Sequence, residues 1–513
     1  MRWPKPPRAY GCRVSEPTIE AEPRQCWIAG IGERGERSLT VRHPFDDTEV
    51  ADVTVPGADQ VEAAIAGAAA IASEFRNSPA ADRARSLHRV ADLLIRRGEE
   101  IAEAITAESG KPWRWAEREV AATVRVFHIA AAAAAEFDGE LGAAGAPHAQ
   151  APAAYGAVLG QAAFSGGAGV LHGQAAYGGA ANASTRLTGV RRRARGPVLA
   201  IGSSTFPLAG MARQVAAALA VGAPVLGKPA SLTPLSALLL GEILAEADLP
   251  TGTFSVLPLR GKDMLELVGD PRVPVVSMVG SRTAGAAVRA AAPGKQFVLE
   301  LGATTTAIVC ADLAGDLDLT EAAEQLAVAA NAQAGQARLA VRRVLVHRDV
   351  AEAFQATLVS AVRALATGSP HDPEVAVGPL VSEEAAILAT QWVNDAIAGG
   401  AKLLTGGVRD RATLTPTVLA VPPEFTSAEV LAPVILLSTV DSTRSAFAVA
   451  NAIGNDLPVA VFTHDMRTAL LAANELDADV LVGEVPDDIA GLEDIDDLLR
   501  AYTRPQHVVL NGG

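Results

Sequence analysis

The stretch that decides the fold runs from residue 196 to residue 301 and opens with the apolar segment Gly196-Pro197-Val198-Leu199-Ala200-Ile201. Short apolar runs recur through this stretch, and a helical pattern separates each run from the next. Strands are predicted at 197–202, 223–227, 253–258, 273–278 and 296–301, and helices at 208–221, 234–247, 262–269 and 282–292. Apolar strands that alternate with helices predict a parallel sheet covered on both faces. The stretch therefore predicts an α/β fold of the nucleotide-binding type.

Similar patterns continue on both sides of this stretch. On the C-terminal side, a second α/β series extends from 304 to about 482, with a strand at 342–347 and helices at 319–332, 349–366, 382–399, 443–453 and 466–476. On the N-terminal side, a hairpin is predicted at 38–54 and helices at 59–75, 80–109 and 113–137. The segment 503–510 has the pattern of a final strand. Two α/β units in one chain are expected.

Composition and charge narrow the class of protein. The chain has 513 residues, 49% of them hydrophobic and 20% charged, which is typical of a soluble globular protein with more than one domain. Its net charge of −15 argues against nucleic acid as a partner. No apolar run is long enough for a membrane span, and the start lacks a signal-peptide core, so a cytoplasmic protein is expected. Cys12, Cys26 and Cys310 are too few for a disulfide framework or a zinc site, and no metal site is predicted.

Two segments depart from these patterns. Residues 1–37 are predicted to be an irregular leader. Residues 143–183 are rich in Ala and Gly and contain no Asp, Glu, Lys or Arg. This composition is typical of a flexible or loosely docked insertion. The aromatic residues Tyr155, Phe164 and Tyr177 leave open a packed or partner-binding role.

Several short motifs occur in a fixed order across the chain. They are Phe206-Pro207-Leu208, Lys228-Pro229-Ala230, Thr233-Pro234-Leu235-Ser236, Gly280-Ser281, Leu299-Glu300-Leu301-Gly302, Val377-Gly378-Pro379-Leu380, Glu429-Val430 and Pro433-Val434. From about residue 38 to the C-terminus, apart from the insertion, the chain resembles the aldehyde dehydrogenase superfamily. The resemblance implies a Rossmann-type cofactor domain (38–142 and 184–302), a catalytic-type domain (303–482) and oligomerisation strands (184–197 and 500–513). It also implies a homodimer or homotetramer.

The resemblance implies NAD or NADP as cofactor. Lys228 matches the lysine that binds the adenosine ribose, and Glu429 matches the carboxylate that holds the nicotinamide ribose. Gly280 and Ser281 open a helix whose backbone N–H groups favour a pyrophosphate. Ser231 stands where NAD-preferring members often carry Glu. Because a serine does not repel a 2′-phosphate, NADP stays open.

The nucleophile loop of the family departs most from the expected pattern. The segment Asn331 to Arg343 reads NAQAGQARLAVRR, in which Gly335 and Gln336 match the family and Arg338 takes the place of the nucleophilic cysteine. The family reaction needs a thiolate, and a guanidinium stays protonated and is no nucleophile. Thr205 replaces the Asn that donates to the oxyanion, and an acidic segment, 483–500, replaces the usual substrate loop. A small aldehyde-type ligand remains compatible with this pattern.

Glu300 matches the general base of the family, and two roles are compatible with it. It could abstract a proton, or it could pair with Arg338, and we expect the ion pair because a buried carboxylate needs a partner. The sequence thus predicts an NAD(P)-binding protein that lacks the thiol step, a pseudoenzyme with a structural or regulatory role. The alternative is an NAD(P)-dependent oxidoreductase that acts on an aldehyde or imine without a covalent intermediate, with Arg338 holding an anionic group.

Overall fold

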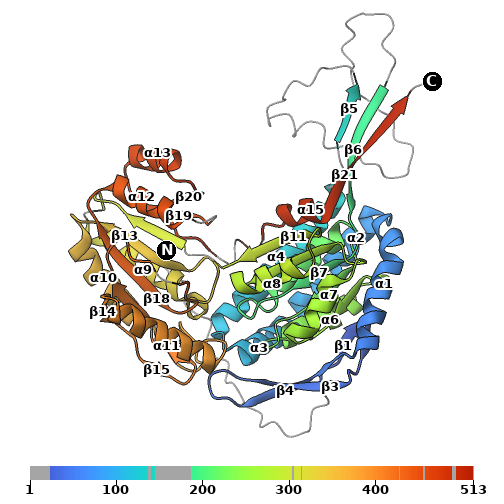
Figure 1. Cartoon of the computed structure of the whole chain (residues 1–513), viewed down its shortest axis with the longest axis horizontal. Coiled ribbons are helices and arrows are strands. Elements are labelled where there is room, and N and C mark those ends of the chain that lie inside the picture. The colour runs from blue at the N-terminus through green and yellow to red at the C-terminus, as the bar shows by residue number, and fades with distance from the viewer. Residues whose placement is uncertain are drawn as a thin grey trace, which may run out of the picture.

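The computed structural model describes residues 23–136, 140–144, 186–302, 305–313, 315–426, 428–454, 457–487, 491 and 493–511. Figure 1 shows two lobes joined side by side and a small sheet that projects from one of them. The predicted insertion at 143–183 lies outside the described residues except for its first two positions, and so does most of the predicted leader.

The first lobe is built on a seven-stranded sheet of order β11-β10-β7-β8-β9-β1-β2. Its parallel strands are β7 (Val198–Ile201), β8 (Val225–Lys228), β9 (Phe254–Val256), β10 (Val275–Gly280) and β11 (Gln296–Leu301). Between them lie α5 (Ala209–Ala220), α6 (Leu235–Ala245), α7 (Gly261–Gly269) and α8 (Arg282–Ala291). All nine elements predicted in this stretch are confirmed.

Both faces of this sheet are buried, as an all-apolar strand requires. Along β7, Val198 and Ala200 belong to one core cluster, while Leu199 and Ile201 belong to another. The first cluster lies under α2 (Ala80–Arg96), α4 (Trp113–Glu136), α5 and α6, and the second lies under α1 (Ala58–Arg76), α7 and α8. The alternation of faces along the strand explains why every residue of β7 is apolar.

The N-terminal part contains the predicted hairpin and two departures from prediction. The hairpin is β3 (Arg37–Arg42) with β4 (Glu49–Val55). Residues 26–33 are not irregular, because β1 (Cys26–Ile28) and β2 (Ile31–Glu33) form an antiparallel pair that extends the sheet at β9. The helix predicted at 80–109 is two helices, α2 and α3 (Gly98–Ser109). The break falls at Arg97, directly before Gly98, and glycine is a weak helix former.

The second lobe carries another seven-stranded sheet, of order β14-β17-β18-β13-β12-β19-β20. Its strands are β12 (Thr305–Val309), β13 (Val341–His347), β14 (Lys402–Thr405), β17 (Thr417–Ala420), β18 (Val434–Val440), β19 (Val459–Phe462) and β20 (Val480–Val482). Its helices include α9 (Asp316–Asn331), α10 (Ala351–Arg363), α11 (Glu383–Ala398), α12 (Thr443–Ile453) and α13 (Met466–Glu475). A two-stranded ribbon, β15 (Arg409–Asp410) with β16 (Thr413–Leu414), completes the lobe.

The chain returns to the first lobe at its C-terminal end. Helix α15 (Asp496–Tyr502) buries Leu498, Leu499 and Tyr502 in the core cluster that contains α5. It leads into β21 (Thr503–Asn511), which pairs with β6 (Arg186–Ala194), and β6 pairs with β5 (Glu140–Ala144). The strands predicted within 184–197 and 500–513 are confirmed as β6, in the centre of this sheet, and β21, at one edge, whereas β5 at the other edge was not predicted. No helix in the described part of the chain is long and apolar enough to cross a membrane.

Candidate functional site

The loop between α9 and β13 is held in an unusual backbone conformation. Gln333 and Ala334 have φ of 55° and 52°, which non-glycine residues adopt rarely and at a cost on the order of 1 kcal/mol each. Gly335 follows with φ of 65°, and a Cβ there would lie 2.1 Å from the carbonyl oxygen of Ala432. The buried Arg342 donates from Nη2 to the carbonyls of Gly335 and Ala337, each at 3.0 Å. The loop that ends at Arg338 is therefore rigidly specified.

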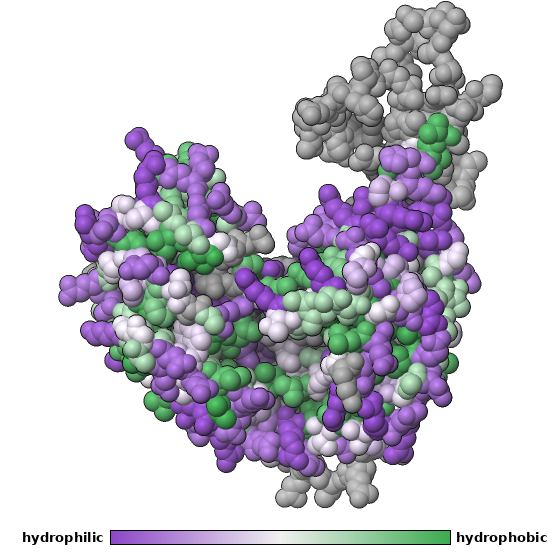
Figure 2. All heavy atoms as spheres, viewed as in Figure 1, coloured by the Kyte–Doolittle hydropathy of each residue, from purple (hydrophilic) through white to green (hydrophobic). Residues whose placement is uncertain are grey.

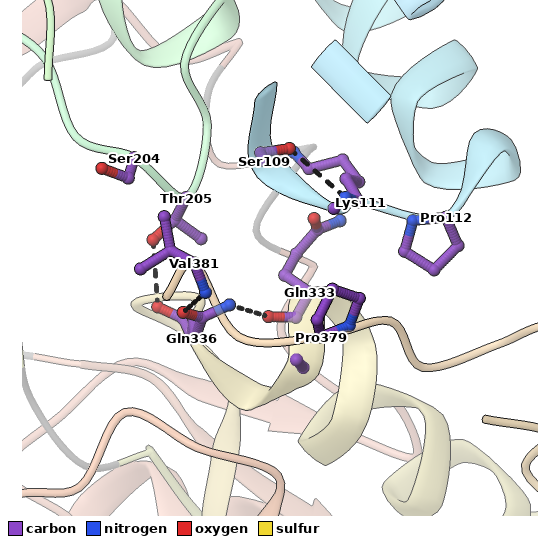
Figure 3. A pocket seen from close by; sticks show the side chains of 11 residues that line it. Ser109, Lys111, Pro112, Ser204, Thr205, Gln333, Gln336, Pro379 and Val381 are labelled. Carbon is purple, nitrogen blue, oxygen red and sulfur yellow. Dashed lines mark hydrogen bonds between the residues drawn. The ribbon is translucent and has the colours of Figure 1, made fainter. Parts of the chain in front are cut away.

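Thr205 lies against this loop, although it comes from the other lobe. Its Oγ1 donates to the carbonyl of Gln336 at 3.4 Å. Gln336 is itself fixed, because its Nε2 donates to the carbonyl of Gln333 at 3.1 Å and its Oε1 accepts from the N–H of Val381 at 3.0 Å. Figure 3 shows these side chains around a small polar pocket that Lys111 also lines. The structure thus brings together two segments that sequence reasoning assigned to one site.

Glu300, on β11, has a different partner from the one predicted. Its carboxylate forms an ion pair with Arg213 of α5, and Arg213 Nε also donates to the carbonyl of Asp494 at 2.8 Å. Both side chains are mostly buried, with 10% of Arg213 and 19% of Glu300 exposed. The predicted Arg338–Glu300 ion pair is therefore wrong. Arg338 is half-buried and makes no ion pair with the residues that the structure describes.

Sequence reasoning missed Arg213, although a signal was available. Helix α5 reads AGMARQVAAALA, and every residue in it is buried, so one arginine in that run must have a buried partner. Arg213 lies about one turn beyond the first residue of the helix, where its guanidinium reaches Glu300 near the end of β11. What the sequence could not reveal is the second anchor, the carbonyl of Asp494, which lies 281 residues away in the chain.

Lys228 ends β8 as a buried ammonium group. Only 6% of the residue is exposed, and burial lowers its pKa to about 8. It makes no ion pair with the described residues, so its charge is available to a ligand. Ser231, three residues later, is half-buried, and its Oγ donates to the carbonyl of Leu259 at 3.4 Å.

The remaining predicted cofactor residues gather at the N-terminus of α8. Gly280 ends β10, and Ser281 caps the helix by accepting from the N–H of Ala284 at 3.2 Å. A Cβ on Gly302 would lie 2.5 Å from Oε1 of Glu429, so this carboxylate lies directly over the glycine. Gly302 and Glu429, which are far apart in the sequence, therefore lie together near the N-terminus of α8. Arg282, the first residue of α8, donates from Nε to the carbonyl of Gly302 at 2.8 Å.

The cysteines in the described part of the chain are not activated thiols. Cys26 and Cys310 are both buried, and burial raises their pKa to about 11 and about 12. Neither is therefore a thiolate near neutral pH. Among the described residues, no group of three His, Cys, Asp or Glu side chains has the arrangement of a metal site.

Comparison with known proteins assigns the family. Residues 31–483 match the model described as "Aldehyde dehydrogenase family", which covers most of the chain. The chain belongs to the aldehyde dehydrogenase family. It is 29% identical over 461 residues to a 3-sulfolactaldehyde dehydrogenase of Priestia aryabhattai, covering 89% of this chain and 88% of that protein. It is 32% identical over 452 residues to a succinate-semialdehyde dehydrogenase [NADP(+)] of Deinococcus radiodurans, covering 86% of each.

Solved structures agree with this assignment. The NADP-dependent glyceraldehyde-3-phosphate dehydrogenase of Bacillus halodurans C-125, complexed with NADP, has a TM-score of 0.82 and 26% identity, covering 96% of this chain and all of that one. Aldehyde dehydrogenase 21 of Physcomitrella patens, in complex with the reaction product succinate, has a TM-score of 0.80 and 28% identity, covering 96% and 99%. The predicted aldehyde dehydrogenase-like α/β fold is confirmed.

Proposed function

We propose that this protein binds NAD or NADP and does not carry out thiol-dependent aldehyde oxidation, so that its role is structural or regulatory. The observation that carries the proposal is Arg338 at the end of a loop whose backbone is rigidly held at Gly335 and Ala337. A loop of this kind fixes the position of the residue that follows it. An arginine there supplies positive charge and hydrogen-bond donors but no nucleophile.

Three features of the first lobe support cofactor binding. A buried lysine without an ion pair is costly unless a ligand uses its charge, and Lys228 is such a group among the described residues. The capped N-terminus of α8 offers N–H groups to a pyrophosphate. Glu429 lies against Gly302, where its carboxylate could accept hydrogen bonds from a ribose. A bound nicotinamide would supply the capacity to transfer hydride.

The state of Glu300 also favours the absence of thiol chemistry. A general base must be free to accept a proton from water or a nucleophile. Here its carboxylate is already engaged in an ion pair with the guanidinium of Arg213. Arg213 is in turn fixed by the carbonyl of Asp494.

The ligand of this site is proposed to be an aldehyde-type molecule with an additional anionic group. The names of similar proteins include 3-sulfolactaldehyde, succinate semialdehyde and alpha-ketoglutarate semialdehyde dehydrogenases, whose named aldehydes all carry a sulfonate or carboxylate. Arg338, half-buried and without an ion pair among the described residues, is the candidate group for such an anion.

A second candidate function also depends on the guanidinium of Arg338. Reduction of an aldehyde or imine by NAD(P)H requires a hydride and a proton and no covalent enzyme intermediate. Arg338 would then hold the anionic end of the substrate while the Thr205 hydroxyl, which now donates to the carbonyl of Gln336, lies beside the reacting carbonyl. An oxidoreductase of this kind would consume NADH or NADPH when an aldehyde or imine substrate is added.

Calorimetric titration with NAD and with NADP tests the cofactor proposal. The wild-type chain is expected to bind one or both, and Lys228→Met is expected to lose most of this affinity. Lys402→Met, which removes an exposed lysine of β14, is the matched control and should bind as the wild type does. Binding by Lys228→Met equal to the wild type would contradict the assignment. A turnover screen in both redox directions then separates the structural role from the reductase.

A further inference from the structure

The small projecting sheet carries a group of arginines that no part of the proposed function uses. This arginine cluster consists of Arg76, Arg191, Arg193 and Arg504. Strands β6 and β21 are antiparallel, and their register places Arg193 opposite Arg504 and Arg191 opposite Gln506. Because side chains alternate along a strand, Arg191 and Arg193 point to the same face. Arg76 is the last residue of α1.

The cluster brings like charges together without neutralising them. Two cations directly opposite on neighbouring strands destabilise the pair. Burial, and the charges of Arg76, Arg191 and Arg504, lower the pKa of Arg193. None of the four arginines makes an ion pair with the described residues, although the chain as a whole carries a net charge of −15. Figure 2 shows hydrophilic residues covering the part of the small sheet that joins the body.

Neutral amides hold these guanidinium groups in place. Arg193 Nη2 donates to Asn77 Oδ1 at 2.6 Å. Arg191 Nε and Arg193 Nη1 both donate to Gln506 Oε1, at 2.8 Å and 3.5 Å. Nε of Arg76 is buried and has no hydrogen-bond partner among the described residues. The amides orient the arginines but leave their charge uncompensated, which is the arrangement expected of a preorganised anion site.

We propose that the arginine cluster binds a small multivalent oxyanion of the phosphate class. Planar guanidinium forks match the spacing of oxygens on a tetrahedral oxyanion, and several of them together favour a divalent ion over a monovalent one. The oxyanion would neutralise the repulsion between Arg193 and Arg504 and so stabilise the pairing of β6 with β21. The ligand could be free phosphate or the phosphate group of a larger metabolite, which share this chemistry.

Thermal unfolding of the full chain tests this site. Sodium phosphate is expected to raise Tm by about 2 °C or more above sodium chloride at the same ionic strength. Arg193→Gln should abolish this difference, and it should also raise Tm in the absence of phosphate because it removes the repulsion. Arg348→Gln, which removes an exposed arginine of the second lobe, should keep the phosphate response. Arg504→Gln provides a second test should Arg193→Gln fail to fold.

Two results would overturn the proposal. One is an equal shift with phosphate and chloride. The other is a phosphate response that survives both Arg193→Gln and Arg504→Gln, since the anion would then bind elsewhere, such as the N-terminus of α8. Loss of self-association in Arg193→Gln, with no phosphate response in the wild type, would assign the cluster to carboxylates of a second copy instead. Pyrophosphate and glycerol 3-phosphate, compared with inorganic phosphate, identify which form of the group binds most tightly.

Discussion

At the residue scale, the ion pair between Arg213 and Glu300 is the main departure from the expected site. A guanidinium at the nucleophile position was expected to bind the carboxylate of Glu300, yet that carboxylate is taken by an arginine from α5. Arg338 makes no ion pair with the described residues, as the proposed binding of an anionic ligand requires. The charge on Glu300 is balanced within the first lobe.

The contribution of this pair can be measured by a double-mutant cycle. Arg213→Gln and Glu300→Gln should each lower the free energy of unfolding by about 2–4 kcal/mol, because each leaves a largely buried charge without its partner. The double variant should recover part of the loss. Urea unfolding gives all four values. Additive losses would show that the pair contributes no coupling, and Arg338→Gln, as a control, should not couple to Glu300→Gln.

Glu108 gives a prediction about pH. It is fully buried in α3 and accepts from the N–H groups of Leu235 and Ser236, and burial raises its pKa to about 7. Between pH 4.5 and about 7 the folded state keeps a proton that the unfolded state releases, so raising the pH through this window lowers stability. The free energy of unfolding of the wild type should therefore fall relative to that of Glu108→Gln over this window. Parallel pH profiles for the two proteins would contradict this.

At the element scale, the loop before β13 is the most strongly specified segment of the candidate site. Gly335→Ala should lower the free energy of unfolding by about 2 kcal/mol or more, since its φ is positive and a Cβ would collide with the Ala432 carbonyl. Gly261→Ala, at a position with nothing within 4 Å of the added Cβ, is the control and should be close to neutral. Chemical denaturation distinguishes the two. Equal stability of both variants would show that the loop is not strained as described.

Elements were predictable where the sequence carried a strong period. The apolar runs of β7, β8 and β10 were predictable because residues on both faces of each strand are buried. The apolar run of β11 was also found, although its residues are only half-buried at the edge of the sheet. The short strands β1 and β2 were not found, since three residues in a polar leader carry no detectable alternation. Strand β5 was missed because Ala and Gly give no contrast between its faces. The break between α2 and α3 had a signal, Gly98, which was outweighed by the continuous helical pattern.

At the scale of the whole molecule, the C-terminal segment packs back on the first lobe. Helix α15 returns from the second lobe to pack on α5, and the carbonyl of Asp494 just before it holds Arg213. The motifs single out Lys228, Ser281 and Glu429 one by one, and their role in cofactor binding stays a prediction. The partner of Glu300 could not, because it depends on a contact between segments that no local pattern connects.

The central claim is that this family member lacks thiol chemistry, and one measurement tests it most directly. Aldehyde-dependent formation of NADH or NADPH is followed with the wild type and with a variant in which Cys12, Cys26 and Cys310 are all serine. We predict no turnover above background in either protein, because our proposal puts Arg338 at the nucleophile position and because the two described cysteines are buried, with pKa values raised far above neutral. Turnover by the wild type that disappears in the cysteine-free variant would contradict the claim.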